Sequence, residues 1–245
     1  PPGHRDRVFR SLFGGARDGR PPGAAVLARA LQRGGREPAV VTDRWNERAL
    51  IACCEVMDLP LPIVVEDSDG ILDLEADLVV FIERLGKTGD GRYYNMRGED
   101  ISCCTDPLDD MASLAMERGI PVLAIGDGGN EAGMANLVPG MGEVLPGFNR
   151  CLSTVPSTVA LPVDVSNWGA YALACLLSCR RGRWLGHGPE EERAMIEAMV
   201  SAGAVDGVTG KNELSVDGLG IAEHMKVVAR LKEIYEEFSM EKSRD

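Results

Sequence analysis

The sequence has little positive charge for its size. It carries 26 lysines and arginines against 38 aspartates and glutamates, a net charge of −12. Proteins that bind nucleic acid or anionic membranes need a basic face, so this balance argues against both partners. A small anion can still bind through a local basic patch, backbone N–H groups or a bound cation. We therefore expect a small anionic substrate as the partner, and a homo-oligomer is compatible with the sequence.

Long apolar runs and paired metal-binding cysteines are also missing. No run reaches the roughly 18 apolar residues that span a bilayer, and no secretory signal is recognisable. The seven cysteines form no C-x-x-C motif, which argues against a zinc site and favours a reducing compartment. The chain begins with Pro1 rather than Met, so a targeting segment upstream would not be seen. We expect a cytoplasmic protein, or one of the mitochondrial matrix if the source is a eukaryote.

Histidine is scarce as well. The three histidines are His4, His187 and His224, and none of them lies in a segment rich in other polar groups. We expect surface or structural roles for them. A hydrolase that relies on a Ser–His–Asp or Cys–His arrangement therefore has little support.

Apolar strands alternate with amphipathic helices from residue 21 onward. This alternation is typical of βα units on a parallel sheet. The sequence thus predicts an α/β fold of the doubly wound type, a Rossmann-like three-layer sandwich with a mostly parallel sheet and helices on both faces. The expected strands are 38–43, 61–67, 76–83, 120–127 and one within 158–167, and the expected helices are 21–35, 46–57, 106–119, 168–179, 189–202 and 219–238.

The expected domain organisation is simple. Residues 1–17 combine glycines and arginines without a clear pattern, so we expect an irregular, truncated lead-in. Residues 18–245 form one domain, because no linker or internal repeat interrupts them. Residues 84–105 show no clear helix, and a loop of this length in a compact domain is usually functional or disordered.

Carboxylates follow most of the expected strands. Asp43, Asp67, Glu83 and Asp127 each end a strand, and Ser166–Asn167 end another. Ligands of open parallel sheets bind beyond the carboxyl ends of the strands, so we expect these groups to converge. Converging carboxylates repel one another unless they take up protons or a cation. Oxygen ligands of this kind suit Mg²⁺ or Mn²⁺, with Ca²⁺ as a third candidate.

The segment GDGGNEAGMAN, residues 126–136, is the densest in such groups. Its glycines permit a tight turn with exposed N–H groups, which makes Gly128 and Gly129 candidates for substrate binding. A turn with a helix cap would use the same residue types. The third glycine of a dinucleotide fingerprint would fall at Glu131, so no nucleotide cofactor is expected. The expected metal ligands are Asp127, Asn130, Glu131 and Glu83.

Other loops offer groups that bind anions. Arg84, Arg97 and Asn95 of the long loop could clamp a carboxylate or phosphate, or form a solvated, salt-bridged surface. Ser166 and Asn167 precede an expected helix, where N–H groups favour anions, although a plain helix cap explains them equally well. The segment GAVDGVTG places Asp206 in a turn or in a loop that closes the site.

Several strings together resemble one family. The strings are DGRPPGAAVLARAL, VVTD, IER, GRYYNMRGEDIS, PLDD, IGDGGNEAGMAN, VSNWGAYALA, GAVDGVTG and VDGL, between about residues 18 and 219. They resemble the C-terminal domain of D-glutamate cyclases and its stand-alone prokaryotic relatives. Leu85 departs from the pattern, since a proline is expected after IER. The partner domain of the long animal proteins is not in this sequence.

The resemblance implies a metal-dependent hydro-lyase that converts D-glutamate to 5-oxo-D-proline and water. Carboxylates at strand ends beside a basic loop fit this reaction. Asp127 and Glu131, with Glu83 or Asp206, could hold a divalent ion that polarises the γ-carboxylate, and Arg84 or Arg97 could hold the α-carboxylate. Two alternatives stay open. One is another divalent-metal enzyme that acts on a small phosphorylated or carboxylated metabolite, such as a phosphohydrolase. The other is a non-catalytic module that binds a metal or metabolite.

Overall fold

The core of the molecule is a six-stranded sheet. The computed structural model describes residues 8–13, 21–65, 68, 76–144 and 146–242. The strand order is β3-β2-β1-β4-β5-β6, and all five pairings are parallel. This is the order of Rossmann folds, in which the winding direction reverses beside the first strand and the ligand crevice opens at that switch point. The doubly wound fold expected from the sequence is confirmed.

The elements have the following bounds. The sheet strands are β1 Val8–Phe13, β2 Glu37–Thr42, β3 Ile63–Val64, β4 Ala76–Ile82, β5 Val122–Gly126 and β6 Val159–Pro162, and β7 Ser215–Val216 pairs with β8 Leu219–Gly220. The α-helices are α1 Pro21–Arg33, α2 Glu47–Val56, α4 Asp110–Glu117, α5 Val138–Val144, α6 Ser166–Arg181, α7 Pro189–Ser201 and α8 Ile221–Lys242. Short 3₁₀ turns are η1 Ser102–Cys104, η2 Met134–Leu137 and η3 Pro146–Phe148.

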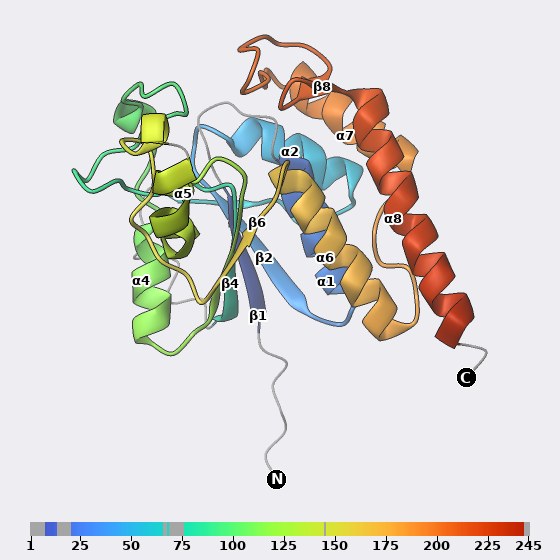
Figure 1. Cartoon of the computed structure of the whole chain (residues 1–245). Coiled ribbons are helices and arrows are strands. Elements are labelled where there is room, and N and C mark those ends of the chain that lie inside the picture. The colour runs from blue at the N-terminus through green and yellow to red at the C-terminus, as the bar shows by residue number, and fades with distance from the viewer. Residues whose placement is uncertain (1–7, 14–20, 66–67, 69–75, 145, 243–245) are drawn as a thin grey trace.

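Alternation along β4 divides the core into two layers. Val79 and Phe81 pack with Met111 of α4, whereas Val80 and Ile82 pack with Leu27 of α1. Successive strand residues point to opposite faces, so an uninterrupted apolar strand fills both layers. Figure 1 shows the result: α4 and α5 lie on one side of the sheet, and α1 and α6 lie on the other. The three-layer sandwich follows from this pattern.

A second helical layer covers α1 and α6. Side chains of α2, α6, α7 and α8 form one buried cluster that includes Cys53, Tyr171, Met195 and Val228. Within the part of the chain that the structure describes, no helix is long and apolar enough to cross a membrane.

Three expectations about element bounds are wrong. Ser166 and Asn167, expected to end a strand, form the first turn of α6, because β6 already ends at Pro162. Residues 8–13, expected in an irregular lead-in, form β1, which lies between β2 and β4 in the sheet. The helix expected from Asp106 begins at Asp110, with Asp109 as its N-cap residue. The Asp109 side chain does not cap the helix, because it accepts hydrogen bonds from the Lys87 N–H (2.9 Å) and from the Tyr93 hydroxyl. The start of α4 is thus set by the neighbouring loop.

The beginning of β1 and the end of α8 lie at one end of the molecule, and the loops that follow the strands lie at the other. In Figure 1 the loop after β4 and the β7–β8 hairpin lie at the end where the strands finish. The first residue of β1 and the last turn of α8 lie at the other end.

Candidate active site

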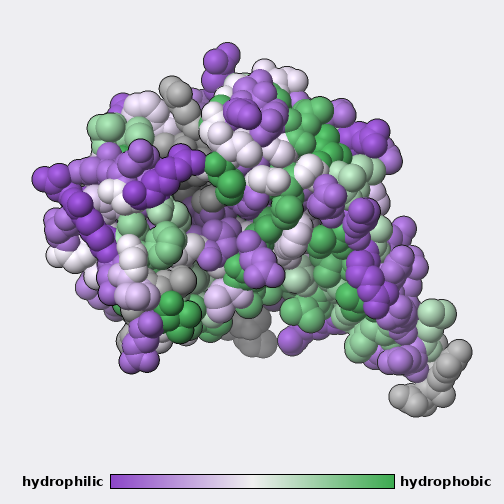
Figure 2. Space-filling view, turned by 45° about the horizontal axis from the view of Figure 1, so that its top comes forward, coloured by the Kyte–Doolittle hydropathy of each residue, from purple (hydrophilic) through white to green (hydrophobic). Residues whose placement is uncertain are grey.

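Three carboxylates meet beyond the carboxyl ends of β4 and β5. Glu83 directly follows β4, Asp127 directly follows β5, and Glu131 lies in the turn after Asp127. Carboxylate oxygens of all three lie within 4.8 Å of one another, with Glu83 and Glu131 buried and Asp127 more accessible. Figure 2 turns this end of the molecule toward the viewer and shows hydrophilic and hydrophobic residues intermingled around a hollow. We call Glu83, Asp127 and Glu131 the acidic cluster.

Glu131 organises the glycine-rich turn from within. Its Oε1 accepts the N–H groups of Asp127 (3.0 Å) and Gly128 (2.8 Å), and its Oε2 accepts that of Gly129 (2.6 Å). Gly129 needs to be glycine because its φ is +85°. The sequence led us to expect exposed N–H groups here, but they donate to a carboxylate of the chain itself. Substrate binding by Gly128 and Gly129 stays a prediction.

Asp127 connects the cluster to helix α6. Its Oδ2 accepts hydrogen bonds from the Ser166 N–H (3.2 Å) and the Ser166 hydroxyl (3.1 Å). The first N–H groups of a helix lack partners within the helix, and the helix dipole favours an anion there. Asp127 is thus held at a fixed place while part of its carboxylate stays accessible. Ser166 itself is fully buried.

Glu83 has an uncommon backbone conformation. Its φ is +53°, which non-glycine residues seldom adopt, and its side chain is 1% exposed. The Glu83 N–H donates to the carbonyl of Ile125 (2.8 Å), which continues the ladder between the two strands. Such conformations persist only where the surrounding structure enforces them, and they are concentrated at functional sites. Here the conformation turns the chain sharply at the end of β4.

The acidic cluster has the chemistry of a site for a hard cation. Three carboxylates at this separation repel one another unless a cation or protons offset their charge. Oxygen ligands from side chains suit Mg²⁺ or Mn²⁺. Asn130, the fourth expected ligand, is 7% exposed and donates from Nδ2 to the carbonyl of Tyr94 (2.9 Å). Asn130 therefore joins the turn to the long loop.

Not every expected carboxylate reaches this site. Asp43 is 1% exposed and accepts a hydrogen bond from Arg84 Nη1 (2.5 Å). Its other oxygen accepts the N–H groups of Trp45 and Asn46, so Asp43 caps its own turn instead of joining the cluster. Asp67, expected at the end of the neighbouring strand, lies outside the described residues.

Arg84 is held inside the protein. Its side chain is fully buried, and besides Asp43 its guanidinium contacts the carbonyl of Asp106. A substrate carboxylate would have to displace the Asp43 ion pair to reach it. Substrate binding by Arg84 stays a prediction.

Asp206 organises a different loop. Its carboxylate accepts hydrogen bonds from the N–H groups of Val208, Thr209 and Gly218 and from the Ser215 hydroxyl, at 2.6–2.9 Å. Burial alone would raise the pKa of Asp206. The hydrogen bonds together outweigh burial, so the pKa lies below its ordinary value. Asp206 is not among the carboxylates that meet within 4.8 Å. A catalytic role for Asp206 stays a prediction.

The long loop lies over the glycine-rich turn. Met96 Sδ would lie 3.0 Å from a Cβ built on Gly128, so the two segments are in contact. The next residue, Arg97, is exposed and donates from Nη2 to the carbonyl of Val208 (2.7 Å). Arg97 thereby connects the long loop to the Asp206 loop. No sequence pattern singles out Met96, because only its position over a glycine makes it relevant.

Asn95 and Asn167 hold the backbone. Asn95 Oδ1 accepts the N–H groups of Arg97 and Glu99, both at 3.0 Å. Asn167 is 1% exposed, and its Oδ1 accepts the N–H of Gly23 (2.9 Å) at the start of α1. A Cβ at Gly23 would lie 2.8 Å from that oxygen, so glycine lets α1 and α6 meet at their N-terminal ends. Binding of substrate by Asn95 or Asn167 stays a prediction.

Two histidines belong to a buried network, which confirms the structural role expected for them. Glu192 accepts hydrogen bonds from the Tyr171 hydroxyl (2.8 Å) and lies 2.9 Å from Nε2 of His187. The Trp168 indole donates to Nδ1 of His224 (3.0 Å), so that nitrogen carries no proton. The network ties α6 to α7 and α8. His4 lies outside the described residues.

All seven cysteines are free thiols. Burial raises the pKa of Cys54 to about 12 and that of Cys175 to about 11. A thiol needs to lose its proton to ligate a metal or act as a nucleophile. These two cysteines therefore pack as small apolar residues.

Comparisons with known proteins agree with the residues quoted above. The family model described as D-glutamate cyclase-like, C-terminal matches residues 16–232. The chain is also 29% identical, over 258 aligned positions, to the human protein named D-glutamate cyclase, mitochondrial. That alignment covers 87% of this chain but 42% of the human protein, so the chain spans less than half of its relative's length.

Proposed function

Because the chain belongs to the D-glutamate cyclase-like, C-terminal family, we propose that it is a metal-dependent hydro-lyase that converts D-glutamate to 5-oxo-D-proline and water. The observation that carries the proposal is the acidic cluster at the carboxyl end of the sheet. The similarity to the human protein, which covers less than half of that protein, supports a cyclase-like function. The specific reaction and the metal are our proposal.

The proposed reaction is a ring closure within one molecule. The ammonium group loses two protons, its nitrogen forms a bond to the γ-carboxyl carbon, and one γ-carboxylate oxygen leaves with those protons as water. Since both reacting groups belong to the same molecule, the protein needs mainly to select a folded conformer. The chemical difficulty lies in the carboxylate, which is a poor electrophile.

The residues of the acidic cluster divide this task. Glu83, Asp127 and Glu131 would hold the cation, and a bound divalent ion supplies Lewis-acid polarisation of the γ-carboxylate. Asp127 is the more accessible of the three, so we assign it the contact with the reacting end of the substrate. A carboxylate of the cluster accepts an ammonium proton. We assign the α-carboxylate to Arg97, because it follows Met96, which contacts the glycine-rich turn, and its guanidinium is exposed.

The occupied turn weighs against the phosphohydrolase alternative. Glycine-rich turns bind phosphate through backbone N–H groups. Here the N–H groups of Asp127, Gly128 and Gly129 already donate to Glu131. A phosphate would have to displace a carboxylate of the protein itself.

The compartment is a further part of the proposal. Seven free thiols favour a reducing compartment, the cytoplasm or the mitochondrial matrix. The human relative is named as mitochondrial, which supports the second of these for a eukaryotic source.

The test measures 5-oxo-D-proline by chiral chromatography. The purified protein is incubated with D-glutamate in Mg²⁺, in Mn²⁺ or in EDTA, with L-glutamate and a set of phosphate esters in parallel. We expect turnover of D-glutamate that EDTA abolishes. The variant Asp127→Asn should lose at least about 100-fold in rate, because it removes a charge from the acidic cluster. Manganese binding, measured by electron paramagnetic resonance, should weaken in the same variant.

The matched control is Asp164→Asn, an exposed aspartate on the connection before α6. It should keep wild-type activity and manganese binding. Turnover of phosphate esters in place of D-glutamate would replace the proposal with the phosphohydrolase, and manganese binding without any turnover would favour the non-catalytic module.

A further inference from the structure

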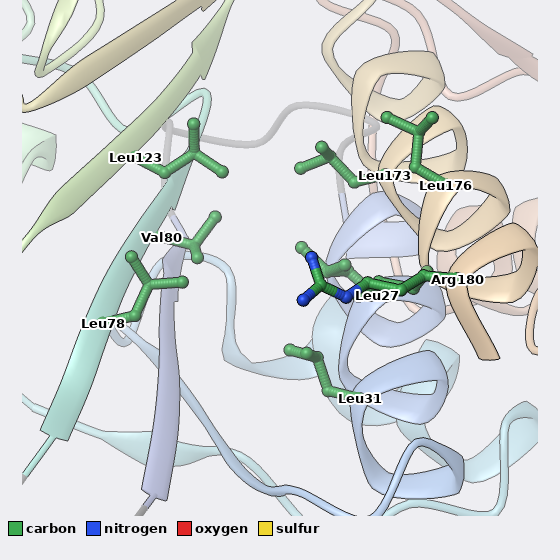
Figure 3. A pocket seen from close by; sticks show the side chains of 9 residues that line it. Leu27, Leu31, Leu78, Val80, Leu123, Leu173, Leu176 and Arg180 are labelled. Carbon is green, nitrogen blue, oxygen red and sulfur yellow. The ribbon is translucent and has the colours of Figure 1, made fainter.

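An apolar cavity lies between the sheet and helices α1 and α6 (Figure 3). Its volume is about 280 Å³. The described side chains that line it are Leu27, Leu31, Leu78, Val80, Leu123, Leu173, Leu176, Leu177 and Arg180. Leu78 and Leu123 lie near the beginnings of β4 and β5, so the cavity is remote from the acidic cluster at the strand ends.

The cavity is open to solvent on one side. Apolar side chains that stay exposed in such a pocket favour an apolar ligand that covers them. Water does not fill a leucine-lined void readily, because it finds no hydrogen-bond partners there, whereas apolar molecules bind in such voids. The cavity is also accessible, since Leu176 is 63% exposed at its edge.

Arg180 places a positive charge at the apolar cavity. Figure 3 shows its guanidinium reaching from α6 toward the strands, among the leucine side chains. Arg180 is exposed to solvent on the last turn of α6, at the edge of the cavity. Among the described residues, no carboxylate lies within ion-pair distance of Arg180.

More positive charge lies next to Arg180. A neighbouring, more polar cavity of about 400 Å³ shares Leu31, Leu177 and Arg180 with the first and adds Arg36 and Arg181 to its lining. Three arginines at one place are notable in a chain with a net charge of −12. An apolar cavity with an arginine-rich mouth fits a ligand with a long apolar body and an anionic end.

We propose that this cavity binds a straight-chain aliphatic carboxylate of about eight to ten carbons, with the tail among the leucines and the carboxylate on Arg180. The length follows from the volume. A water-sized group occupies about 30 Å³, so the cavity holds roughly nine such groups. The site is independent of the acidic cluster and of the reaction proposed for it.

The chain-length series is the first test. Isothermal titration calorimetry is run with hexanoate, octanoate and decanoate below the concentrations at which micelles form. Each added methylene contributes about fourfold in affinity when it is buried, so octanoate should bind about 16-fold more tightly than hexanoate. The uncharged 1-decanol should bind at least tenfold more weakly than decanoate, because it cannot pair with Arg180.

Two variants locate the site. Leu173→Trp fills the cavity, and Arg180→Glu reverses the charge at its mouth; each should reduce decanoate affinity at least tenfold. The matched control is Arg118→Glu, the same charge change on an exposed arginine at the end of α4, and it should bind decanoate as the parent does. Circular dichroism confirms that each variant is folded. No saturable binding of decanoate, equal affinity for 1-decanol, or binding that neither variant weakens would overturn the proposal.

Discussion

At the scale of single residues, Glu131 decides what the glycine-rich turn can bind. Its carboxylate accepts three consecutive backbone N–H groups, an arrangement that other proteins offer to phosphate. Hydrogen bonds to an ionised acceptor are about twice as strong as neutral ones. The turn therefore serves to place one oxygen-rich side chain beside Glu83 and Asp127, and these three N–H donors are already engaged when an anion approaches.

Replacing Glu131 with glutamine tests this role. In Glu131→Gln the amide NH₂ would face one of the three N–H donors, so at least one buried donor loses its acceptor. We expect the free energy of unfolding to fall by about 2–4 kcal/mol, measured by urea denaturation. The control Glu117→Gln, on the exposed surface of α4, should change it by less than about 0.5 kcal/mol. Equal stability of the two variants would show that Glu131 does not hold the turn.

The sequence predicted which carboxylates lie at the strand ends better than it predicted which residues they pair with. Glu83 and Asp127 are predicted because they follow strands that end at one edge of a sheet, and Glu131 because it lies in the polar, glycine-rich segment after them. Asp43 also follows such a strand, but it forms an ion pair with Arg84, which lies 41 positions later in the sequence. A pattern of strand ends cannot distinguish a carboxylate that is open to a ligand from one already neutralised by a buried arginine.

At the scale of elements, one ion pair fastens α1 to α7. Arg29 of α1 is buried and donates to both oxygens of Glu191. Glu191 also accepts the N–H of Gly188 (2.7 Å) and so caps the first turn of α7. The hydrogen bond from Arg29 is the main cause that lowers the pKa of Glu191 from 4.5 to about 2.

This ion pair predicts a pH dependence of stability. The pKa of Glu191 is lower in the folded chain than in the unfolded chain, so its contribution is present above about pH 4.5 and is lost as the pH falls toward about 2. Because Glu191 is 42% exposed, solvent screening limits the contribution to about 1 kcal/mol. Urea denaturation at pH 7 and pH 3 should show a smaller difference for Glu191→Gln than for the parent.

The control for this pair is its neighbour. Glu190 is 80% exposed and lies 3.9 Å from Arg193, a separation at which an ion pair contributes little. Glu190→Gln should leave the pH dependence unchanged. If both variants flatten it equally, the effect comes from general surface charge and not from the contact between α1 and α7.

The long loop shows how an element without regular structure becomes ordered. Tyr93 and Tyr94 are 4% and 1% exposed, and the Tyr93 hydroxyl donates to Asp109. Burial and the charge of Asp109 raise the pKa of Tyr93 above its ordinary value, so the hydroxyl keeps its proton and acts as the donor. The sequence predicted a long loop over residues 84–105. It could not predict which carboxylate the tyrosine would find, because that partner belongs to the next helix.

At the scale of the whole molecule, the sequence predicted the architecture but not its central strand. Five strands were recognisable as apolar runs, which is what strands buried on both faces require. The segment VFRSLF includes an arginine and a serine, and glycines and arginines follow it, so it gave no strand signal. Its place in the sheet is set by parallel pairing with β2 and β4. These partners are distant in the sequence, so no local pattern reveals the strand.

The position of β1 predicts the effect of a truncation. A chain that starts at residue 18, the domain boundary expected from the sequence, lacks the strand that joins β2 and β3 to β4, β5 and β6. We expect this chain to lose its cooperative thermal unfolding transition, measured by circular dichroism. A chain that lacks only residues 1–7 keeps all six strands and should retain the transition. A cooperative transition in the shorter chain would mean that β1 is dispensable.

The polypeptide enters the sheet at Val8 and leaves the body at Lys242, and both points face away from the acidic cluster. A reporter domain fused directly at Val8 or Lys242 would therefore attach at the end opposite Glu83, Asp127 and Glu131. Under the proposed function, such a fusion should leave D-glutamate turnover unchanged.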